Sequence, residues 1–370
     1  MSELEVQQLV KRFGNNLVVD HINFKVNSGE FFVLLGPSGG GKTTLLRMLC
    51  GLEQADEGRI LINNQDVTQL TPRQRNIGMV FQDYGLYPNM DVYGNIAYGL
   101  EARNMARAEI DKRVKMGVEM LGLTPHLRRS IVDLSGGEQQ RVALTRALVK
   151  DAEVYLYDEP LSNLDPKLRY QARKDILKVH RTKLKPSVYV THDQSEAFAM
   201  GDRIAVIAKG QLQQIGTPDE LLQSPANIFM ARFVGTPPMN IIRGRVQLNN
   251  GFSIVQTNDI RVNLPPIWRG RIERTAGAEV LVGIRPTALI PEWGLQHLEY
   301  QPKTAFKAQI TDIEALVGET VVTLKTLDGT TLVAIFEDSE VEPEIGRIVT
   351  IYVDEEQLRL FDVQTEQALK

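Results

Sequence analysis

The sequence predicts two domains, an α/β domain with a largely parallel sheet and then a smaller all-β domain. Three observations support this fold class. At 370 residues the chain exceeds the usual size of one domain. Up to about residue 235, short apolar runs alternate with helical patterns, as in α/β proteins. After a turn-rich junction at Gly235–Asn240 the pattern changes to short, spaced strands, which is typical of small β-barrels.

Composition and charge exclude several classes of protein. The net charge of −4 argues against a nucleic-acid binder that depends on phosphate contacts. No apolar run is much longer than Phe31–Leu35, whereas a membrane-spanning helix needs roughly 20 such residues. The N-terminal MSELEVQQLV lacks the basic head and apolar stretch of a signal peptide, and the single cysteine, Cys50, fits a reducing cytoplasm. We therefore expect a soluble cytoplasmic protein.

Charge is spread unevenly between the two predicted domains. Residues 1–235 carry 29 basic and 27 acidic side chains, whereas residues 236–370 carry 13 basic and 19 acidic ones. The acidic run at Glu337–Glu344 is interpreted as a solvated face.

In the first domain, residues 1–235, four buried segments define the sheet. Glu30–Leu35 reads as a buried strand that leads through a glycine-rich turn into a helix from Thr43. Val154–Tyr157 and Ser187–Thr191 read as further strands, and Ile204–Gln213 as a hairpin that turns at Lys209-Gly210. More than a hundred residues separate the first two strands, and 91–150 is mostly helical by pattern. The sequence therefore predicts a helical insertion there.

The second domain, residues 236–370, is predicted to be all-β. Its strands are short, alternate in polarity and are separated by turns, which indicates a small barrel or a pair of barrels. The predicted strands are Arg243–Val246, Val280–Ile284, Thr320–Leu324, Thr331–Ile335 and Val349–Val353.

The turn after the first buried strand matches the phosphate-binding loop G-x-x-x-x-G-K-[ST]. Glycines let successive backbone N–H groups point at phosphate oxygens, and the following helix presents its positive end. Lys42 supplies a charge for the β- and γ-phosphates, and the Thr43 hydroxyl is a ligand for Mg²⁺. The predicted ATP-binding residues of this loop are Ser38, Gly39, Gly40, Gly41, Lys42, Thr43 and Thr44.

The strand at Val154–Tyr157 is followed by two carboxylates, Asp158 and Glu159. In an enzyme with a phosphate loop, such an aspartate holds the Mg²⁺ shell. The adjacent Glu159 is placed to polarise the attacking water as a general base. The pair means little alone, but after a phosphate loop it indicates ATP hydrolysis.

Further along the chain, Leu134-Ser135-Gly136-Gly137-Glu138-Gln139-Gln140-Arg141 resembles the signature of the ABC-family ATPases. By itself Ser-Gly-Gly would be read as a helix cap. The resemblance implies that Ser135, Gly136 and Gly137 complete the ATP site of a second, identical subunit. The signature has Glu138 where the family commonly has glutamine, and the phosphate loop has Gly40 and Thr43 where cysteine and serine are frequent.

Four other segments match ABC-family motifs in the expected order. Gln82 resembles the Q-loop glutamine, which implies contact with Mg²⁺ and the attacking water. Ser162–Asp165 resembles the D-loop, and His192 the switch histidine at the γ-phosphate. Phe13 takes the place of the aromatic residue that stacks on adenine, which is most often tyrosine in the family.

The resemblance implies partners as well as chemistry. Two chains would close head to tail around two ATP molecules, and the stretch Gln82–Met90 would lie near a transmembrane permease. An extracytoplasmic solute-binding protein would then act indirectly, and the chain would sit at the cytoplasmic face of the membrane.

The second domain resembles the tails of ATPase subunits of bacterial maltose and glycerol-phosphate importers. The resemblance rests on Val234–Asn240, Val282–Pro286 and Gly318, and it implies OB-type barrels, called TOBE domains, that serve dimer contacts and regulation. It favours import of a sugar, polyol or sugar phosphate. The same motifs leave open polyamine, iron, sulfate or molybdate as cargo. A non-transport ABC protein is less favoured, because such proteins usually have two cassettes or coiled coils. A module that only binds ATP is also less favoured, because it would not need Glu159 and His192.

Overall fold

A computed structural model describes residues 2–249, 252–257, 260–265, 268, 277–297, 302–316, 318–337 and 341–369. The chain divides into two compact units, Met1–Pro218 and Asp219–Lys370, and each is treated by itself below. Within the described residues, no helix is both long enough and apolar enough to cross a membrane.

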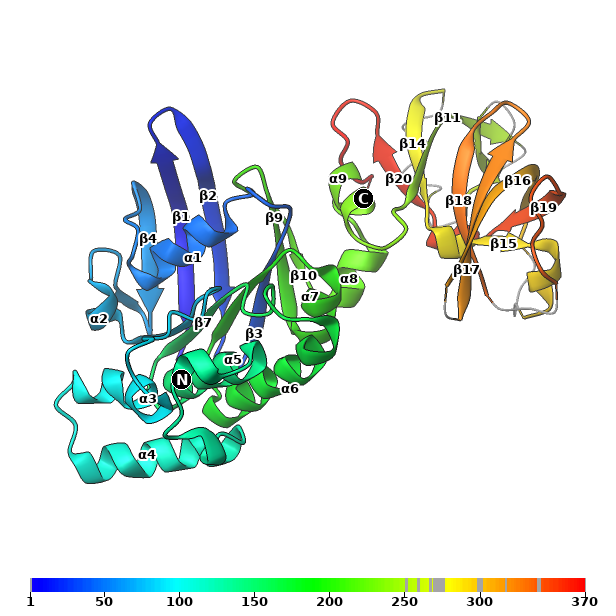
Figure 1. Ribbon diagram of the computed structural model, residues 1–370. Helices are drawn as coiled ribbons and strands as arrows, with labels where there is room; N and C mark the ends of the chain where they lie inside the picture. Colours follow the sequence, from blue (N-terminus) through cyan, green and yellow to red (C-terminus); the bar gives the residue numbers. More distant parts are fainter. Residues whose placement is uncertain are drawn as a thin grey trace. The chain divides into compact units, whose positions relative to one another are not determined.

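The first unit contains a six-stranded sheet in the order β10-β9-β3-β8-β7-β6 (Figure 1). All neighbouring strands are parallel except β9 and β10, which form an antiparallel hairpin. The three central strands are buried along their whole length, so they form because apolar residues fill both faces. The strands are β3 (Phe31–Leu35), β6 (Ile77–Val80), β7 (Val154–Asp158), β8 (Ser187–Thr191), β9 (Arg203–Ala208) and β10 (Gln211–Gly216).

The predicted bounds of β3, β7, β8 and the β9–β10 hairpin agree with the structure within three residues. The strand β6 was not predicted. The helix after the phosphate loop, α1, starts at Lys42, one residue before the predicted Thr43. Two further helices, α6 (Pro166–Lys183) and α7 (Gln194–Met200), pack on the opposite face of the sheet, where His180 of α6 meets Phe31 and Glu196 of α7 accepts from the Tyr189 hydroxyl.

A second sheet in this unit was not predicted. It is antiparallel in the order β2-β1-β4-β5 and shares one apolar core with α1 and the parallel sheet. Its two long strands pair with several register shifts, and Gln8 and His21 have positive φ of 47° and 49°. Such bulges break the two-residue alternation by which a strand is recognised. The strands are β1 (Leu4–Phe13), β2 (Asn16–Val26), β4 (Glu57–Ile62) and β5 (Gln65–Asp66).

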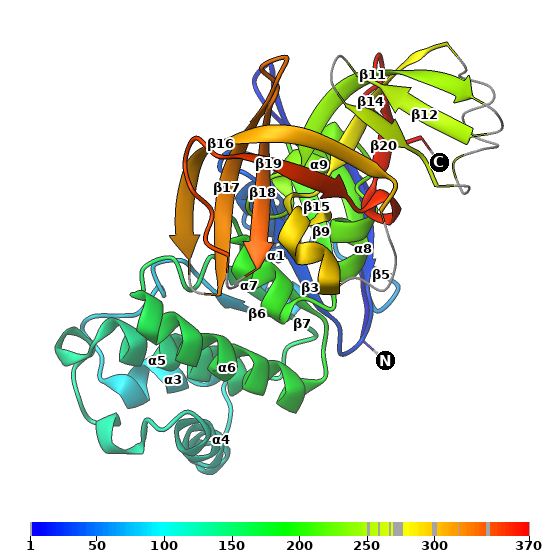
Figure 2. The ribbon, with the colours of Figure 1, turned by 90° about the vertical axis from the view of Figure 1, so that its right-hand side faces the viewer.

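Residues 91–150 form the predicted helical insertion. Its helices enclose a small apolar cluster of their own, and both views place α4 on the outer side, away from the sheet (Figures 1 and 2). Asp91 caps the first helix by accepting from the N–H of Gly94 at 2.7 Å. The helices are α3 (Val92–Glu101), α4 (Arg107–Met120) and α5 (Gly136–Leu148), with the short α2 (Pro72–Arg75) before them and 3₁₀ turns at Thr124–His126 and Ile131–Asp133.

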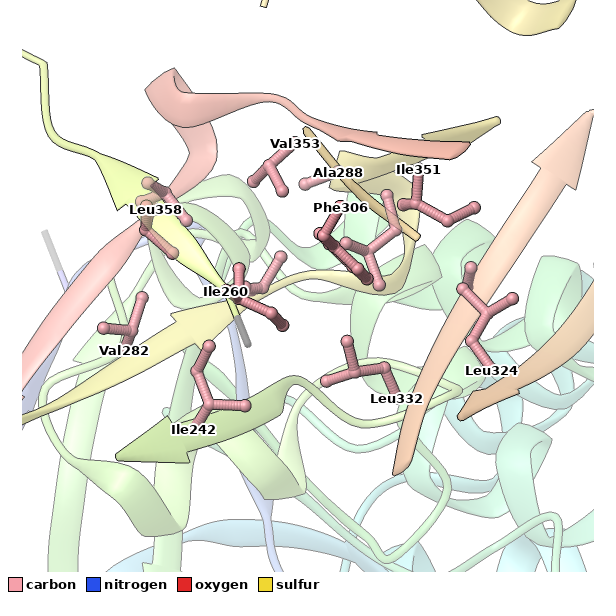
Figure 3. Packing of buried hydrophobic residues seen from close by; sticks show 14 of the residues in the cluster. Ile242, Ile260, Val282, Ala288, Phe306, Leu324, Leu332, Ile351, Val353 and Leu358 are labelled. Carbon is pink, nitrogen blue, oxygen red and sulfur yellow. The ribbon is translucent and has the colours of Figure 1, made fainter. Parts of the chain in front are cut away.

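The second unit is mostly β and contains two five-stranded sheets, ordered β13-β12-β11-β14-β20 and β15-β19-β16-β17-β18. Alternate residues of both sheets meet in one apolar cluster, in which Ile242, Phe306 and Ile351 converge (Figure 3). The five predicted strands are all present. The strands are β11 (Asn240–Asn249), β12 (Phe252–Gln256), β13 (Arg261–Asn263), β14 (Glu279–Ile284), β15 (Leu289–Pro291), β16 (Thr304–Leu316), β17 (Glu319–Thr326), β18 (Thr331–Glu337), β19 (Ile348–Val353) and β20 (Arg359–Asp362).

Short helices connect and flank these sheets. They are α8 (Pro218–Gln223), α9 (Ile228–Phe233) and 3₁₀ turns at Pro286–Ala288, Glu292–His297 and Glu355–Gln357. Of the acidic run Glu337–Glu344, residues 338–340 lie outside the described residues, and Glu342 and Glu344 are exposed as expected for a solvated face.

Arg285 joins α8 and α9 to the end of β14. Its guanidinium donates to the carbonyl of Val234 at 2.5 Å and to that of Leu222 at 2.6 Å. Burial, and to a lesser degree the charge of Arg359, lower the pKa of Arg285 to about 10. A partly buried cation at the ends of two helices satisfies carbonyls that no helical N–H can reach.

We expect Arg285→Met to lower the free energy of unfolding of the C-terminal unit by about 2–3 kcal/mol, because two partly buried carbonyls lose their donor. Both tryptophans, Trp268 and Trp293, belong to this unit, so tryptophan fluorescence during urea unfolding reports it selectively. The control is Arg243→Met, which removes an exposed ion pair with Glu279 and should cost less than about 0.5–1 kcal/mol. Equal effects of the two substitutions would contradict the assignment.

Candidate active site

The phosphate loop connects β3 to α1 and lies directly against the backbone of neighbouring strands. A Cβ on Gly36 would lie 2.0 Å from the carbonyl oxygen of Ile207 in β9. Gly41 precedes α1 with a φ of 98°, and a Cβ there would lie 2.4 Å from the carbonyl oxygen of Val18 in β2. These two positions therefore require glycine, for space at the first and for both space and conformation at the second. Ser38 and Gly39 are exposed at the tip of the loop.

Lys42 is buried at the start of α1, with 4% of its surface exposed. Its Nζ donates to the carbonyl oxygens of Gly36 and Pro37, each at 2.9 Å. Burial lowers the pKa of Lys42, and the carboxylates of Glu159 and Asp158 oppose this effect. The ammonium group is thus held inside the loop, where a phosphate would meet it. Thr43 and Thr44 follow it, half-buried in the first turn of α1.

Asp158 ends β7 and is almost fully buried. Burial, and next the neighbouring charge of Glu159, raise its pKa to about 6, while a hydrogen bond with the Thr43 side chain acts in the opposite direction. Its Oδ1 is buried and has no hydrogen-bond partner among the described residues. A carboxylate oxygen without a partner beside a hydroxyl oxygen is the donor set that a hard divalent cation prefers. The residues present therefore fit Mg²⁺.

Glu159 and His192 face each other beside this position. His192 follows β8, and its Nδ1 lies 3.0 Å from Oε2 of Glu159. Since a carboxylate only accepts hydrogen bonds, the proton of this pair is on Nδ1, and Nε2 is left for another partner. Glu159 has a φ of 42°, an unusual conformation for a residue with a side chain. Its N–H donates to the carbonyl of Val190 in β8 at 3.1 Å, which holds the backbone there.

The D-loop residues connect Glu159 with Gln82. The Ser162 hydroxyl donates to the carbonyl oxygen of Glu159 at 2.9 Å. Asn163 Nδ2 donates to the carbonyl oxygen of Gln82 at 3.0 Å. The side chain of Gln82 itself is exposed just after β6.

Phe13 lies at the end of β1, with 49% of its surface exposed and Lys11 Nζ 5.2 Å from its ring centroid. This ring is available for stacking, but no contact with the phosphate loop is seen in the described part of the chain.

The signature residues lie apart from this cluster. Ser135 caps α5, so the helix-cap interpretation of Ser-Gly-Gly is also correct. Ser135 and Gly136 are exposed, and Gly137 is half-buried. Among the described residues, no hydrogen bond or ion pair joins them to the phosphate loop, Asp158 or Glu159. The structure thus brings Lys42, Thr43, Asp158, Glu159 and His192 together and keeps Ser135–Gly137 separate.

His126, which was not predicted, places its Nε2 3.3 Å from Oε1 of Glu138 in the signature. No sequence signal identifies it, because its partner is 12 residues away and on another helix.

Comparison with known proteins agrees with this arrangement. Residues 19–162 match the family described as ABC transporter, and residues 235–289 match the MalK OB fold domain. The chain is 42% identical over 377 residues to the trehalose/maltose import ATP-binding protein MalK of Thermococcus litoralis, with 100% of both chains covered. The chain belongs to the ATP-binding proteins of ABC transporters.

Two other members of this ABC family are similar over their full length. The oligosaccharides import ATP-binding protein MsmX of Bacillus subtilis is 39% identical over 371 residues, with 100% of both chains covered. The sn-glycerol-3-phosphate import ATP-binding protein UgpC of Escherichia coli is 39% identical over 368 residues, with 99% of both covered.

Among solved structures, a dimeric ATP-binding cassette in a post-hydrolysis state bound to ADP and Pi is 29% identical. It matches with a TM-score of 0.52 over 58% of this chain and 98% of that one. The predicted fold class and the prediction of an ABC ATPase are confirmed.

The raised pKa of Asp158 has a consequence for the stability of the ATPase without nucleotide. The folded chain binds this proton more tightly than the unfolded chain, so ionisation of Asp158 destabilises the fold as pH rises from about 4 to about 6. We expect Asp158→Asn to raise the free energy of unfolding by up to about 3 kcal/mol at pH 8 and by far less near pH 4. Urea unfolding followed by circular dichroism at the two pH values measures this.

The same Asp158→Asn variant should lose most of the stabilisation that Mg²⁺ and ATP together give the native chain. A variant that is no more stable than the native chain at pH 8 would contradict the conclusion that the buried carboxylate is destabilising.

Proposed function

We propose that the chain is the ATP-hydrolysing subunit of an ABC importer and that two copies close head to tail around two ATP molecules. The observation that carries the proposal is the pairing of Glu159 with His192 beside Asp158 and the buried Lys42. A module that only binds ATP needs the phosphate loop and the lysine. ATP hydrolysis requires, in addition, a carboxylate that is held by a histidine next to the metal position.

Each side chain has a separate task in this mechanism. The loop N–H groups and Lys42 bind the β- and γ-phosphates, and Phe13 stacks on the adenine. Thr43, Asp158 and Gln82 would hold Mg²⁺, which neutralises phosphate charge and orients the γ-phosphate when bound. Glu159 polarises the attacking water. His192 holds the Glu159 carboxylate through Nδ1 and presents Nε2 towards the γ-phosphate.

The separation of the signature from the phosphate loop supports the head-to-tail arrangement. Ser135 and Gly136 are exposed, Gly137 is half-buried, and within one subunit the three contact none of the hydrolytic residues in the described part of the chain. In a second copy they would reach the γ-phosphate across the interface. A similar cassette has been solved as a dimer with ADP and Pi, which supports this arrangement.

The names of the relatives support a carbohydrate cargo. MsmX is named for oligosaccharides, MalK for trehalose and maltose, and UgpC for glycerol-3-phosphate. We therefore propose uptake of a sugar, polyol or sugar phosphate delivered by a solute-binding protein. Polyamine, iron, sulfate or molybdate is the alternative cargo, and a non-transport role is the less favoured one. The C-terminal unit serves dimer contacts and regulation in this proposal, without nucleic acid.

A groove beside the Q-loop provides a docking site for the permease. Two cavities of about 320 and 340 Å³ share Ile77, Met79, Phe81, Gly99 and Lys150. Their walls are mainly apolar, and Lys150 donates to the carbonyl of Ile77, with its pKa lowered by burial to about 8. Tyr87 of the stretch Gln82–Met90 and Tyr98 of α3 pack against each other at the rim, with ring centroids 4.7 Å apart and ring planes inclined at 51°. An apolar helix of the permease with an acidic flank would fit this groove and would hold the subunit at the cytoplasmic face of the membrane.

We expect Glu159→Gln to reduce ATP turnover by roughly 100-fold or more, since it removes the general base. ATP binding should persist, and the variant should accumulate as a closed dimer with ATP. Phosphate release and size-exclusion chromatography with Mg²⁺ and ATP measure the two effects. Turnover within tenfold of the native rate would refute the assignment of Glu159, whereas loss of ATP binding would show that the substitution damaged the site.

For the groove, we expect Tyr98→Ala to reduce the ATPase activity of the reconstituted transporter at least fivefold. The activity of the isolated subunit should change less than twofold, because within the described residues no hydrogen bond, ion pair or ring contact joins Tyr98 to Lys42, Asp158, Glu159 or His192. The control is Tyr170→Ala, which removes an exposed tyrosine on α6 outside the groove. A transporter that tolerates Tyr98→Ala as well as the control would argue against docking here.

A further inference from the structure

The hydroxyl of Ser135 is engaged within its own subunit. It donates to Oε2 of Glu138 at 2.7 Å, and the Ser135 N–H donates to the same oxygen at 2.8 Å. The Glu138 N–H faces the Ser135 hydroxyl oxygen at 3.4 Å, which completes a reciprocal helix cap. These hydrogen bonds are the main reason that the pKa of Glu138 lies below its usual value, so Glu138 is an anion at neutral pH.

A serine hydroxyl carries one proton, so it cannot donate to Glu138 and to a phosphate at the same time. Hydrogen bonds to a charged carboxylate are also about twice as strong as those between neutral groups. A phosphate oxygen that accepts from this hydroxyl would lie within roughly 5.5 Å of Oε2, since each oxygen is about 2.7 Å from the same hydroxyl oxygen. Two anions at that distance repel each other.

His126 contacts the other oxygen of the Glu138 carboxylate. His126 Nε2 lies 3.3 Å from Oε1, and the side chains of His126 and Glu138 are only 18% and 20% exposed. The nearby charges of His126 and Arg141 further lower the pKa of Glu138. Nδ1 of His126 is buried without a partner among the described residues, so the contact with Glu138 is the polar interaction that orients this ring.

We propose that Glu138, oriented by His126, is a positioning residue that restrains the Ser135 hydroxyl and so raises the ATP concentration at which two copies close. This inference rests on the proposed head-to-tail dimer, in which Ser135 meets the γ-phosphate of the partner's site. Closure then requires Ser135 to exchange a carboxylate for a phosphate, and Glu138 opposes that exchange by charge and by hydrogen bonding.

Glu138→Gln tests the restraint without removing the helix cap. Glutamine also forms the reciprocal cap with serine, so the start of α5 is retained while the charge is lost. The substitution is made in the full-length chain that also carries Glu159→Gln, so that ATP-bound dimers are not consumed by hydrolysis. Size-exclusion chromatography over a range of ATP concentrations with Mg²⁺ gives the midpoint of dimer formation.

We expect Glu138→Gln to lower this midpoint at least fivefold. Binding of a fluorescent ATP analogue to the monomer should change less than twofold, because Ser135 is not part of the monomer's own site. With Ser135→Ala also present, Glu138→Gln should no longer shift the midpoint. His126→Leu should shift the midpoint only when Glu138 is present, since the ring acts through that carboxylate.

The outcomes separate this inference from the proposed function. If the chain with Glu159→Gln alone forms no dimer with ATP, the head-to-tail proposal fails and this inference fails with it. If that chain dimerises and Ser135→Ala raises the midpoint, but Glu138→Gln leaves it unchanged or raises it, only the restraint is overturned. A shift from Glu138→Gln that persists with Ser135→Ala also overturns it, because Glu138 would then act by another route.

Discussion

The parallel pairing of β3, β8 and β7 is the constraint that brings together the residues of the hydrolytic cluster, which are Lys42, Thr43, Asp158, Glu159 and His192. In register, Leu35 lies opposite Thr191, and Val190 lies opposite Asp158. The next residues along each strand therefore leave the sheet at the same edge, which is where ligands bind in open α/β sheets. The phosphate loop, Glu159 and His192 meet there although His192 lies 156 residues after Gly36. A shift of one strand by one residue would turn its side chains to the opposite face and separate them.

Much of this cluster could be predicted from the sequence, because its members have fixed positions relative to strands. Lys42 and Thr43 follow β3 after a loop of defined length, Asp158 ends β7, and Glu159 is the next residue. The contacts between them could not be predicted in the same way. Whether Nδ1 or Nε2 of His192 faces Glu159, and whether Ser162 or Asn163 holds the neighbouring loop, depends on side-chain positions that no spacing encodes.

The fold also has parts that could be predicted from the sequence and parts that could not. Continuous apolar runs predicted β3, β7 and β8, because a strand buried on both faces has no polar residues to interrupt it. The sheet of β1 and β2 was missed because its strands are long but bulged, with Gln8 and His21 in a conformation that breaks the alternation. The Glu138–His126 contact was missed for another reason. It joins a helix cap to a separate 3₁₀ turn, and a histidine there has no distinguishing pattern around it.

The two hydrogen bonds from Ser162 and Asn163 connect the backbone at Glu159 with the backbone at Gln82. One fixes the carbonyl of Glu159 and the other the carbonyl of Gln82, and the two donors are adjacent in the chain. The backbone at Gln82 and the backbone at Glu159 are therefore anchored to a single dipeptide. These two hydrogen bonds connect the backbone of Gln82 to that of Glu159 by a path that does not pass through the strands of the sheet. Because Glu159 already occupies a strained conformation, a small displacement is enough to change its alignment.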